Sequence, residues 1–347
     1  MNSNAARLPV WQGETPLICR ARCDAVNDCA TFTLAAPEAR RFDFHPGQFI
    51  SLGVEIDGRT HWRAYSIASS PNRGEEIAIS VKRVTGGRVS NWLLDHWQAG
   101  MALPALAPAG DFGLARDGTL PPRMAFFSAG SGITPLMSMT RWLLENNAPV
   151  DIDFFHSARS DADVLYAEEL QALAAAHPRF RLHLFLTQPQ GRLSAHAGRL
   201  DAPRLRALLA RTAGLGAWLC GQAAYMDDVA RWLGELGVAP ADIRRESYVA
   251  APMQVAADAV KHRVLVPAFG VDTEIAEGEA LLDVLERAGV PIIGACRTGV
   301  CGSCKCKIEG GAVNTTSTAP LTPEEVAGGV VLACSSTVSG EVSVSLV

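Results

Sequence analysis

The chain lacks a long apolar run: no segment approaches the roughly 18 consecutive apolar residues that a membrane-spanning helix needs. Its first residues, MNSNAARLPVWQGETPL, lack the basic start and apolar stretch of a secretion signal. It also has no internal repeat and no low-complexity tract, and it is 48% hydrophobic and only 19% charged. These absences argue against a membrane, repeat or disordered protein, and a globular cytoplasmic protein is expected.

An excess of basic residues is also missing, so nucleic acid is not an expected partner. Residues 262–347 hold five Lys/Arg against ten Asp/Glu, whereas the rest of the chain holds 26 of each, which together give the net charge of −5. All of the net negative charge therefore lies in the last quarter of the chain. Such a segment favours a partner with a basic docking patch, although an acidic surface can also serve solubility alone.

The length of 347 residues predicts two or three domains. Residues 12–117 contain short β-rich runs separated by turn signals, such as CATFTLAAP and EIAISVKRVTGG, which predict an antiparallel barrel or sandwich. Residues 120–248 alternate strand and helix patterns, beginning with MAFFSAGSGITPLMSMTRWLLEN, which predict a parallel α/β sheet. The fold class is therefore multidomain.

The last part of the chain begins with a predicted linker over residues 249–261, which is rich in small residues. In the domain predicted over 262–347, HRVLVPAFGVDTEIA is typical of a hairpin and EALLDVLERAGV of a short amphipathic helix that Gly289 ends. Thr322, Pro323 and Glu325 form a capping box that predicts a second short helix.

Disulfides are not expected in a cytoplasmic protein, so the nine cysteines need another explanation. Four of them lie within GACRTGVCGSCKCKIEGG (294–311), where a zinc knuckle, a redox dithiol or an iron–sulfur cluster are the alternatives. Cys296, Cys301 and Cys304 have the spacing C-x4-C-x2-C, with Cys334 thirty positions further on, and this spacing is that of a plant-type [2Fe–2S] ferredoxin. These four cysteines are the predicted metal ligands.

Glycines at 294, 299 and 302 permit the bends that such a loop requires. The whole segment resembles the β-grasp ferredoxins. Cys306 follows the third ligand by two positions and is interpreted as a structural neighbour. Cys19, Cys23 and Cys29 match no metal spacing and are interpreted as small buried thiols of the barrel strands.

A [2Fe–2S] cluster carries one electron at a time, whereas a nicotinamide delivers two electrons as a hydride. A second cofactor must therefore separate the two electrons, and flavin is the usual one. The sequence R-x-Y-S at residues 63–66 lies on an expected strand, and GGRVSNWL follows at 86–93. Tyr65 offers a flat face for the isoalloxazine ring, Ser66 a hydroxyl near the hydride-accepting nitrogen, and Arg63 a charge for the pyrophosphate. Alone, the pattern is also compatible with an ordinary strand that has an aromatic core residue.

The segment AGSGITP (129–135) follows an apolar strand and opens a helix. Gly130 and Gly132 allow close approach, and Pro135 preorganises the first helical turn, whose amides favour a phosphate or polar ligand. Because proline stands where a third glycine would be, this is not the G-x-G-x-x-G fingerprint.

Together these segments resemble the ferredoxin–NADP reductase superfamily, and specifically reductases with a C-terminal ferredoxin. The resemblance spans about residues 12–347 and also rests on HPGQF (45–49), PAGDFG (108–113), LCG (219–221) and RESY (245–248). It implies a Greek-key flavin barrel, usually with FAD, followed by a domain for NADH or NADPH. Phthalate-type members use FMN, but GGRVSNWL is more similar to the FAD branch.

The resemblance also assigns site residues. It implies that Ser66, Cys220 and Glu246 are catalytic, with Cys220 beside the nicotinamide carbon. The residues assigned to cofactor binding are Arg63, Ala64, Tyr65, Ser66, Val81, Lys82, Gly87, Arg88, Val89, Ser90, Gly130, Gly132, Thr134, Pro135, Arg159, Ser160, Cys220, Gly221, Met226 and Tyr248.

The choice of dinucleotide is left open by the residues after the second strand of the α/β domain. An acidic side chain there favours a free ribose hydroxyl and an arginine favours a 2′-phosphate, and Arg159, Ser160 and Asp161 supply both kinds. The resemblance to ferredoxin-fused reductases favours NADH.

The predicted function is NAD(P)H-dependent electron transfer, in which hydride passes to FAD and single electrons leave through [2Fe–2S]. The resemblance implies a terminal oxygenase of the Rieske type as acceptor, acting on quaternary ammonium or aromatic substrates. A reductase of a hybrid-cluster protein has the same architecture. A redox-sensing interaction protein is an alternative from another class, although a sensor needs no hydride donor.

Overall fold

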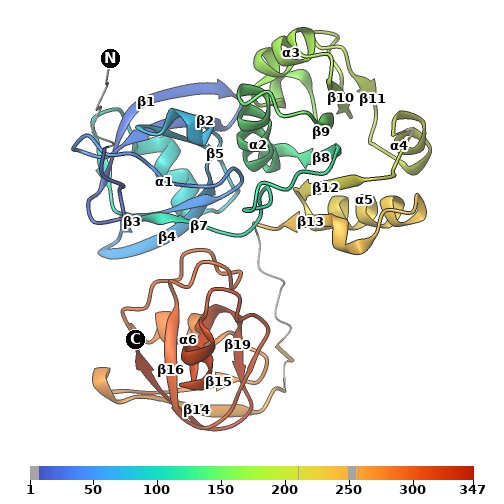
Figure 1. The fold of residues 1–347 in the computed structure, drawn as a ribbon. Coiled ribbons are helices and arrows are strands. Elements are labelled where there is room, and N and C mark those ends of the chain that lie inside the picture. Colours follow the sequence, from blue (N-terminus) through green and yellow to red (C-terminus); the bar gives the residue numbers. More distant parts are fainter. Residues whose placement is uncertain (1–7, 210, 249–254, 257) are drawn as a thin grey trace. The chain divides into compact units, whose positions relative to one another are not determined.

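The structure is a computed structural model that describes residues 8–209, 211–248, 255–256 and 258–347 (Figure 1). Seven of the thirteen positions of the predicted linker over 249–261 therefore lie outside the described residues, and its last residue, Lys261, already begins a strand. Contacts divide the chain into two units, one formed by residues 1–50 and 65–247 and the other by residues 51–64 and 248–347. Each unit is described by itself. No helix among the described residues is long and apolar enough to cross a membrane.

The N-terminal part folds into two antiparallel sheets, as the β-rich sequence predicts. One sheet has the strand order β5-β2-β1-β6 and the other has the order β4-β3-β7. A tight turn at Asp57 and Gly58, both with positive φ, joins β3 to β4, as expected for an Asp-Gly hairpin. The strands are β1 (Leu17–Val26), β2 (Cys29–Ala35), β3 (Phe49–Ile56), β4 (Arg59–Ser66), β5 (Ile77–Lys82), β6 (Ala102–Leu103) and β7 (Ala105–Ala109).

The three barrel cysteines do not all have the predicted burial. Cys19 and Cys29 are buried, but Cys23 is exposed. In a regular strand Cys19 and Cys23 would share a face, because side chains alternate with a period of two. The register of β1 shifts between Cys19 and Ala21, and this bulge turns Cys23 outward.

The barrel sequence also contains a helix that the strand pattern did not predict, α1 (Arg88–His96). Its buried side chains, Val89, Ser90, Leu93 and Leu94, repeat at intervals of three and four residues, which is the helical period. Gly87 is its N-cap and gives no side-chain cap, so the first amides of the helix point out of its N-terminus.

The second part of this unit is a parallel sheet with the order β11-β10-β9-β8-β12-β13, as predicted. The chain moves outward from β8 through β9 and β10, and then returns to the other side of β8 with β12. This reversal places a topological switch point at the carboxyl ends of β8 and β12, which is where open α/β sheets bind ligands. The strands are β8 (Arg123–Ala129), β9 (Asp151–Ala158), β10 (Phe180–Leu186), β11 (His196–Ala197), β12 (Leu215–Cys220) and β13 (Ile243–Glu246).

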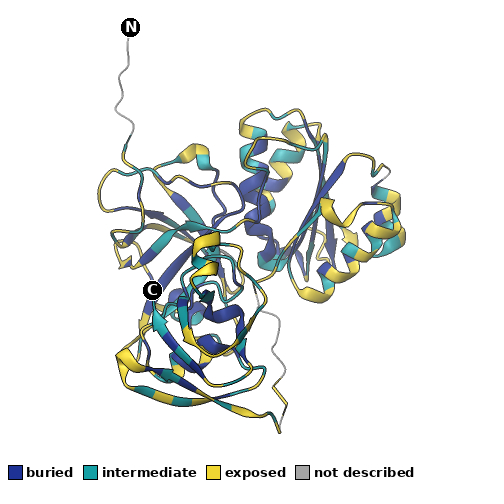
Figure 2. Ribbon diagram, turned by 60° about the horizontal axis from the view of Figure 1, so that its bottom comes forward, coloured by how far each residue is buried: buried dark blue, intermediate teal, exposed yellow. Residues whose placement is uncertain are grey.

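Consecutive phenylalanines on the strands pack on opposite faces of this sheet. Phe126 and Phe154 join the core with α2 and α3, whereas Phe127 and Phe155 join the core with α4 and α5. Each fully buried phenylalanine contributes about 2 to 3 kcal/mol. In Figure 2, most of α2 is dark blue and the outer side of α5 is yellow. The helices are α2 (Ile133–Glu145), α3 (Ala167–Ala176), α4 (Ala202–Leu208) and α5 (Ala223–Glu235).

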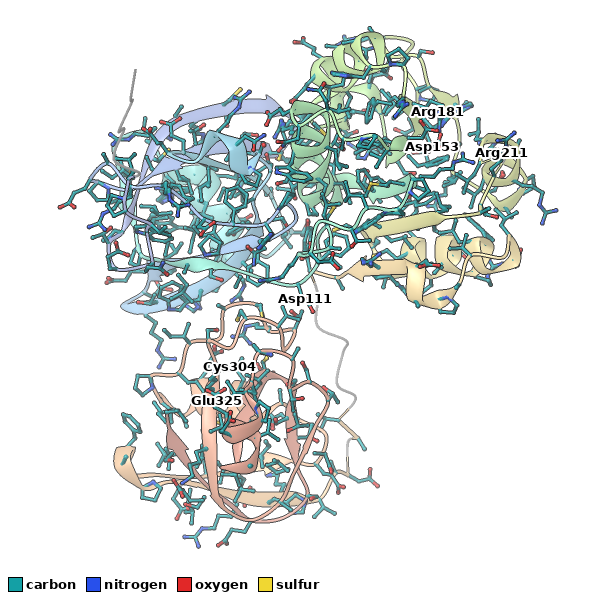
Figure 3. The ribbon with its side chains drawn as sticks, in the orientation of Figure 1. Asp111, Asp153, Arg181, Arg211, Cys304 and Glu325 are labelled. Carbon is teal, nitrogen blue, oxygen red and sulfur yellow. The ribbon has the colours of Figure 1, made fainter. Side chains whose placement is uncertain are left out.

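An ion pair with a buried carboxylate joins β9 and β10 of the parallel sheet. The Asp153 carboxylate accepts hydrogen bonds from Arg181 at 2.7 and 2.8 Å, and His183 Nε2 lies 3.2 Å from it. Figure 3 labels Asp153 and Arg181. Burial alone would raise the pKa of Asp153, but the bonds from Arg181 and His183 outweigh it and lower the pKa to about 2.

The C-terminal residues form a mixed sheet with the order β15-β14-β20-β16-β18, in which β14 and β20 are parallel. The predicted hairpin is β14 and β15, and the predicted helices are α6, which Gly289 follows with a φ of 80°, and α7, which has the Thr322–Glu325 capping box. The elements are β14 (Lys261–Val266), β15 (Val271–Ala276), α6 (Leu281–Arg287), β16 (Lys305–Gly310), β17 (Val313–Thr315), α7 (Pro323–Ala327), β18 (Val330–Leu332), β19 (Ser336–Val338) and β20 (Val342–Leu346).

Candidate functional site

The four predicted cluster ligands come together from two places in the chain. Cys296, Cys301 and Cys304 lie on the loop between α6 and β16, and Cys334 lies on a single 3₁₀ turn after β18. The Cys296 thiol interacts with Cys301 and Cys334, and Cys304 interacts with Cys334. Figure 3 labels Cys304, which is 2% exposed, and Cys334 is 6% exposed. The loop therefore gathers four thiols at one partly buried place.

These interactions perturb the thiol pKa values. Hydrogen bonds with Cys301 and Cys334 lower the pKa of Cys296, and the same contacts raise the pKa of its two partners. The backbone amide of Thr298 donates to Cys296 Sγ at 3.4 Å, and that of Ser303 donates to Cys301 Sγ at 3.5 Å. Amide donors of this kind stabilise thiolates, which are the form that binds iron.

The shape of the cluster loop depends on a glycine and on ion pairs with α6. Gly299 has a φ of 78°, and a Cβ there would lie 2.6 Å from the Ser317 Cβ. Arg297, next to the first cysteine, also has a positive φ, and its guanidinium binds Asp283 at 2.8 Å and also Glu286. Both acids lie on α6, so this helix holds the loop in place.

A [2Fe–2S] group fits this donor set. The two irons of such a cluster take four thiolates in all, and the four thiols here contact one another in the order 301, 296, 334, 304. Within the ranges that the structure describes, no three His, Cys, Asp or Glu side chains surround a point as ligands of a single metal ion. Cys306 lies on β16, fully buried, and burial raises its pKa to about 12. This burial is in keeping with its interpretation as a structural neighbour of the ligands.

The predicted flavin residues occupy one strand end and one helix end. Arg63, Ala64 and Tyr65 are half-buried on β4, and Ser66, the last residue of that strand, is 5% exposed. The segment Gly87–Ser90 opens α1. A Cβ on Gly87 would lie 2.7 Å from Ser90 Oγ and 2.9 Å from the Val84 Cβ, so only glycine fits this turn without a shift. A helix N-terminus without a side-chain cap fits a pyrophosphate.

The predicted nucleotide loop lies at the switch point of the parallel sheet. Gly130–Gly132 form a 3₁₀ turn between β8 and α2, which begins at Ile133, two residues before Pro135. A Cβ on Gly132 would overlap the Cys220 carbonyl oxygen, so only glycine allows this loop to touch the end of β12. Thr134 Oγ1 donates to the Ser131 carbonyl at 3.0 Å and so shapes the same turn.

The remaining predicted residues differ in exposure. Val81 and Met226 are buried apolar side chains at 0% and 2% exposure, whereas Tyr248 is 45% exposed. Lys82 is exposed, and its Nζ lies 3.7 Å from where a Cβ on Gly130 would be. Lys82 therefore brings a cation to the glycine loop, as expected for a residue near a dinucleotide phosphate.

The three predicted catalytic residues are brought together. Cys220 and Glu246 are neighbours in the parallel register of β12 and β13, with Sγ 3.9 Å from Oε2. The Ser66 hydroxyl donates to the same Oε2 at 3.5 Å. Although part of Glu246 stays accessible, burial of its carboxyl and the nearby Asp111 raise its pKa to about 8 against these two hydrogen bonds. Glu246 is therefore mostly a neutral carboxylic acid near pH 7, able to hold a proton.

Sequence reasoning missed a histidine beside this group. His156 pairs in register with Ser128, which pairs with Cys220, so a polar row crosses the carboxyl ends of β9, β8, β12 and β13. Ser128 Oγ lies 2.8 Å from His156 Nδ1, and burial, together with the Lys82 charge, lowers the histidine pKa to about 3. The sequence did carry a signal for this pairing: FFSAG (126–130) and FFHSA (154–158) place Ser128 and His156 at the same position, directly after two phenylalanines.

The acidic residues near the expected ribose site bind the protein itself. Asp161 accepts backbone hydrogen bonds from Gln190, Arg192 and Leu193 at 2.5 to 2.8 Å. Asp163 accepts from the Ser160 hydroxyl at 2.6 Å and lies 3.4 Å from the Arg159 guanidinium. These carboxylates stabilise the turn after β9 and the loop after β10.

Comparison with known proteins identifies all three parts. Residues 18–113 match the oxidoreductase FAD-binding domain, residues 126–231 the oxidoreductase NAD-binding domain, and residues 267–339 the 2Fe-2S iron-sulfur cluster binding domain. The chain is 36% identical to the glycine betaine monooxygenase reductase subunit of Pseudomonas aeruginosa, covering 91% of this chain and 90% of that protein.

Two further proteins are similar to this chain over most of their length. The NADH oxidoreductase HCR of Escherichia coli is 33% identical, over 84% of this chain and 87% of its own. The crystal structure of phthalate dioxygenase reductase matches 97% of this chain and all of its own, with a TM-score of 0.64 and 22% identity, which supports the fold. The chain belongs to the ferredoxin–NADP reductase superfamily, as a reductase with a C-terminal [2Fe–2S] ferredoxin domain.

Proposed function

We propose that this chain is the reductase component of a terminal oxygenase of the Rieske type that acts on a quaternary ammonium substrate. The observation that carries this proposal is the 36% identity to a glycine betaine monooxygenase reductase subunit over nearly the full length of both chains. We assign the flavin domain to residues 12–117, the nucleotide domain to 120–248 and the ferredoxin domain to 262–347. NADH is the proposed donor, and the cytoplasm the proposed location, in keeping with nine free cysteines.

When bound, FAD takes hydride from the nicotinamide and the cluster passes on one electron at a time. The chain's residues have distinct roles in this proposal. Tyr65 supports the flavin ring, Gly132 and Thr134 shape the loop that receives the nicotinamide, and Cys296, Cys301, Cys304 and Cys334 hold the iron.

Ser66, Cys220 and Glu246 are assigned to the place where hydride crosses. Glu246 holds its proton near pH 7 because of its burial, so a charged carboxylate does not face the redox partners. The Ser66 hydroxyl and the Cys220 thiol both bind the same carboxyl oxygen, which orients the two groups relative to each other.

Reconstitution tests the proposal. The purified reductase, NADH and a terminal oxygenase encoded beside it are mixed with glycine betaine under air, and formaldehyde and demethylated product are measured. The proposal predicts product formation that needs all components. NADH-driven reduction of an artificial acceptor without product from any quaternary amine would contradict the assigned partner.

A hybrid-cluster protein is the second candidate acceptor, which the 33% identity to an NADH oxidoreductase HCR supports. Anaerobic mixing of NADH, reductase and a hybrid-cluster protein distinguishes the two, because cluster reduction in that partner and not in the oxygenase would favour this candidate. A redox sensor without turnover is disfavoured by the glycine loop at the sheet switch point, since a sensor does not need a hydride donor.

A further inference from the structure

Helix α2 hydrogen-bonds to the backbone that directly follows the R-x-Y-S strand. Ser138 Oγ donates to the Ser69 carbonyl at 2.7 Å, and Arg141 Nη1 donates to the Ala68 carbonyl at 2.5 Å. These carbonyls lie two and three residues after Ser66, in the same unit as α2. The nucleotide domain therefore holds the end of the flavin strand directly.

The Arg141 side chain is fixed from three sides. It is 17% exposed, and it forms a two-pronged pair with Glu169 of α3 at 2.7 and 2.5 Å. Its guanidinium carbon also lies 4.8 Å from the centre of the Tyr166 ring. With Nε and Nη2 held by Glu169, the Nη1 group is aimed at the Ala68 carbonyl. A lysine cannot reproduce this fork.

Tyr166 makes a second connection between the same domains. Its hydroxyl lies 2.6 Å from Ser80 Oγ on β5, which lies 2.6 Å from Thr31 Oγ1 on β2. Tyr166 has a φ of 59°, a conformation that is rare for a bulky residue and persists only where several contacts enforce it. The start of α3 is thus strained to reach the barrel.

Apolar packing joins the same two domains. Cys29 of β2, Phe112 and Leu114 belong to the hydrophobic core that contains Ile133 and Met137 of α2. The Trp218 indole of β12 donates to the Gly113 carbonyl at 2.9 Å. The contacts of Arg141 and Tyr166 are therefore accompanied by apolar packing and a further hydrogen bond between the same two domains, and together these contacts form the interdomain seam.

Helix α2 connects this seam to the glycine loop at which the nicotinamide is proposed to bind. The helix begins directly after the Gly130–Gly132 turn, and Arg141 lies about two turns further along it. A single helix therefore connects the glycine loop to Arg141. Hydride transfer requires reacting atoms about 3 to 3.5 Å apart, and a 1 Å misplacement can slow it about 100-fold.

We propose that Arg141 is a positioning residue for hydride transfer, which acts by fixing the glycine loop of α2 to the backbone that follows Ser66. This inference rests on the proposed function. It predicts that loosening the seam lowers the rate of hydride transfer while leaving nucleotide affinity nearly unchanged, because the hydrogen bonds named above join protein groups to one another.

The test uses FAD-loaded holoprotein and compares Arg141→Ala, Arg141→Lys and Tyr166→Phe. Arg231→Ala is the matched control, because Arg231 also makes two ion pairs and stacks on an aromatic ring, Trp232, but all within α5. Three quantities are measured: the limiting rate of flavin bleaching at saturating NADH or NADPH, the nucleotide Kd, and amide hydrogen exchange over residues 67–72.

For Arg141→Ala we expect a limiting rate about 10- to 100-fold lower, a Kd within about twofold of wild type and faster exchange over residues 67–72. Arg141→Lys should restore part of the rate, and Arg231→Ala should match wild type in all three. Tyr166→Phe removes only one hydroxyl, so this variant provides the test if Arg141→Ala does not fold. Its limiting rate of flavin bleaching should be about threefold or more below that of wild type.

Wild-type rates per bound flavin in the seam variants, even with a lowered Tm, would overturn the inference and leave Arg141 a purely stabilising residue. A wild-type flavin that neither NADH nor NADPH bleaches would instead overturn the proposed function, and the inference with it. The two failures are distinguished by the behaviour of the unmodified protein.

Discussion

The Ser66 hydroxyl lies 3.5 Å from a carboxyl oxygen of Glu246, although 180 residues separate the two in the chain. Ser66 ends a strand of the flavin barrel and Glu246 ends the last strand of the parallel sheet. Because Cys220 approaches the same oxygen, three groups from three strands meet at one point. The folded chain thus brings the serine, the cysteine and a protonated acid into contact.

The raised pKa of Glu246 predicts a pH-dependent cost in stability. The folded-state pKa of about 8 exceeds the ordinary value of 4.5, so the fold favours the protonated carboxyl. This contribution to the free energy of unfolding is fully present below pH 4.5 and is lost as the pH rises through 8. Glu246→Gln keeps a neutral side chain at every pH. The unfolding free energy of the variant should therefore exceed that of wild type by an amount that grows between pH 4.5 and 8, to about 1 kcal/mol or more. Urea unfolding of both holoproteins across this range checks this, and a difference independent of pH would contradict it.

Cys301→Ser should remove the visible absorbance of the cluster while FAD content and ferricyanide reduction by NADH remain. The reason is that the thiol is a proposed iron ligand and its loop packs on α6, within the ferredoxin domain. Cys306→Ser is the control, because this buried cysteine lies two residues from Cys304 and should leave the cluster intact. Loss of both chromophores in Cys301→Ser would show that the domains do not function separately.

Two glycine-to-alanine substitutions should change the stability of the fold in opposite directions. In Gly132→Ala the new Cβ overlaps the Cys220 carbonyl oxygen, so the loop must shift, with about 1 to 3 kcal/mol lost and weaker nucleotide binding. In Gly234→Ala, within α5, the new Cβ meets nothing within 4 Å, and the helix should gain about 0.5 to 1 kcal/mol. Thermal unfolding and nucleotide titration measure both effects. Unchanged nucleotide affinity in Gly132→Ala would remove this loop from the proposed site.

Added salt should slow electron delivery to the partner protein. Residues 262–347 carry five Lys/Arg and ten Asp/Glu, and the module keeps a net charge of −5 even though its cations are ion-paired with acids. Long-range steering depends on net charge, so the second-order rate constant should fall about tenfold between 0.05 and 0.5 M salt. Stopped-flow mixing measures this rate, and a constant value would exclude steering by the acidic module.

The cluster loop and the overall domain types could be predicted because their signals are local. Four cysteines with a fixed spacing, strand and helix periods, and a capping box at Thr322 all lie within short segments. The helix α1 was missed because its period lies inside a β-rich region, and Cys23 was misjudged because a bulge cannot be seen from alternation alone.

The rest depends on contacts between distant residues. The sequence left the role of Asp161 near the ribose open, and in the fold its carboxylate accepts hydrogen bonds from amides some thirty residues away. The pairing of Ser128 with His156 requires the strand register, and the contact of Arg141 with Ala68 requires the docking of two domains. No local pattern encodes these relationships.

The central claim is that reducing equivalents enter in pairs and leave singly, and anaerobic titration of the holoprotein with NADH tests it most directly. Visible absorbance follows the flavin, and low-temperature electron paramagnetic resonance follows the cluster. We predict that about 1.5 equivalents of NADH reduce both centres, since FAD takes two electrons and the cluster one. A cluster that stays oxidised after the flavin is fully bleached by excess NADH would contradict the account.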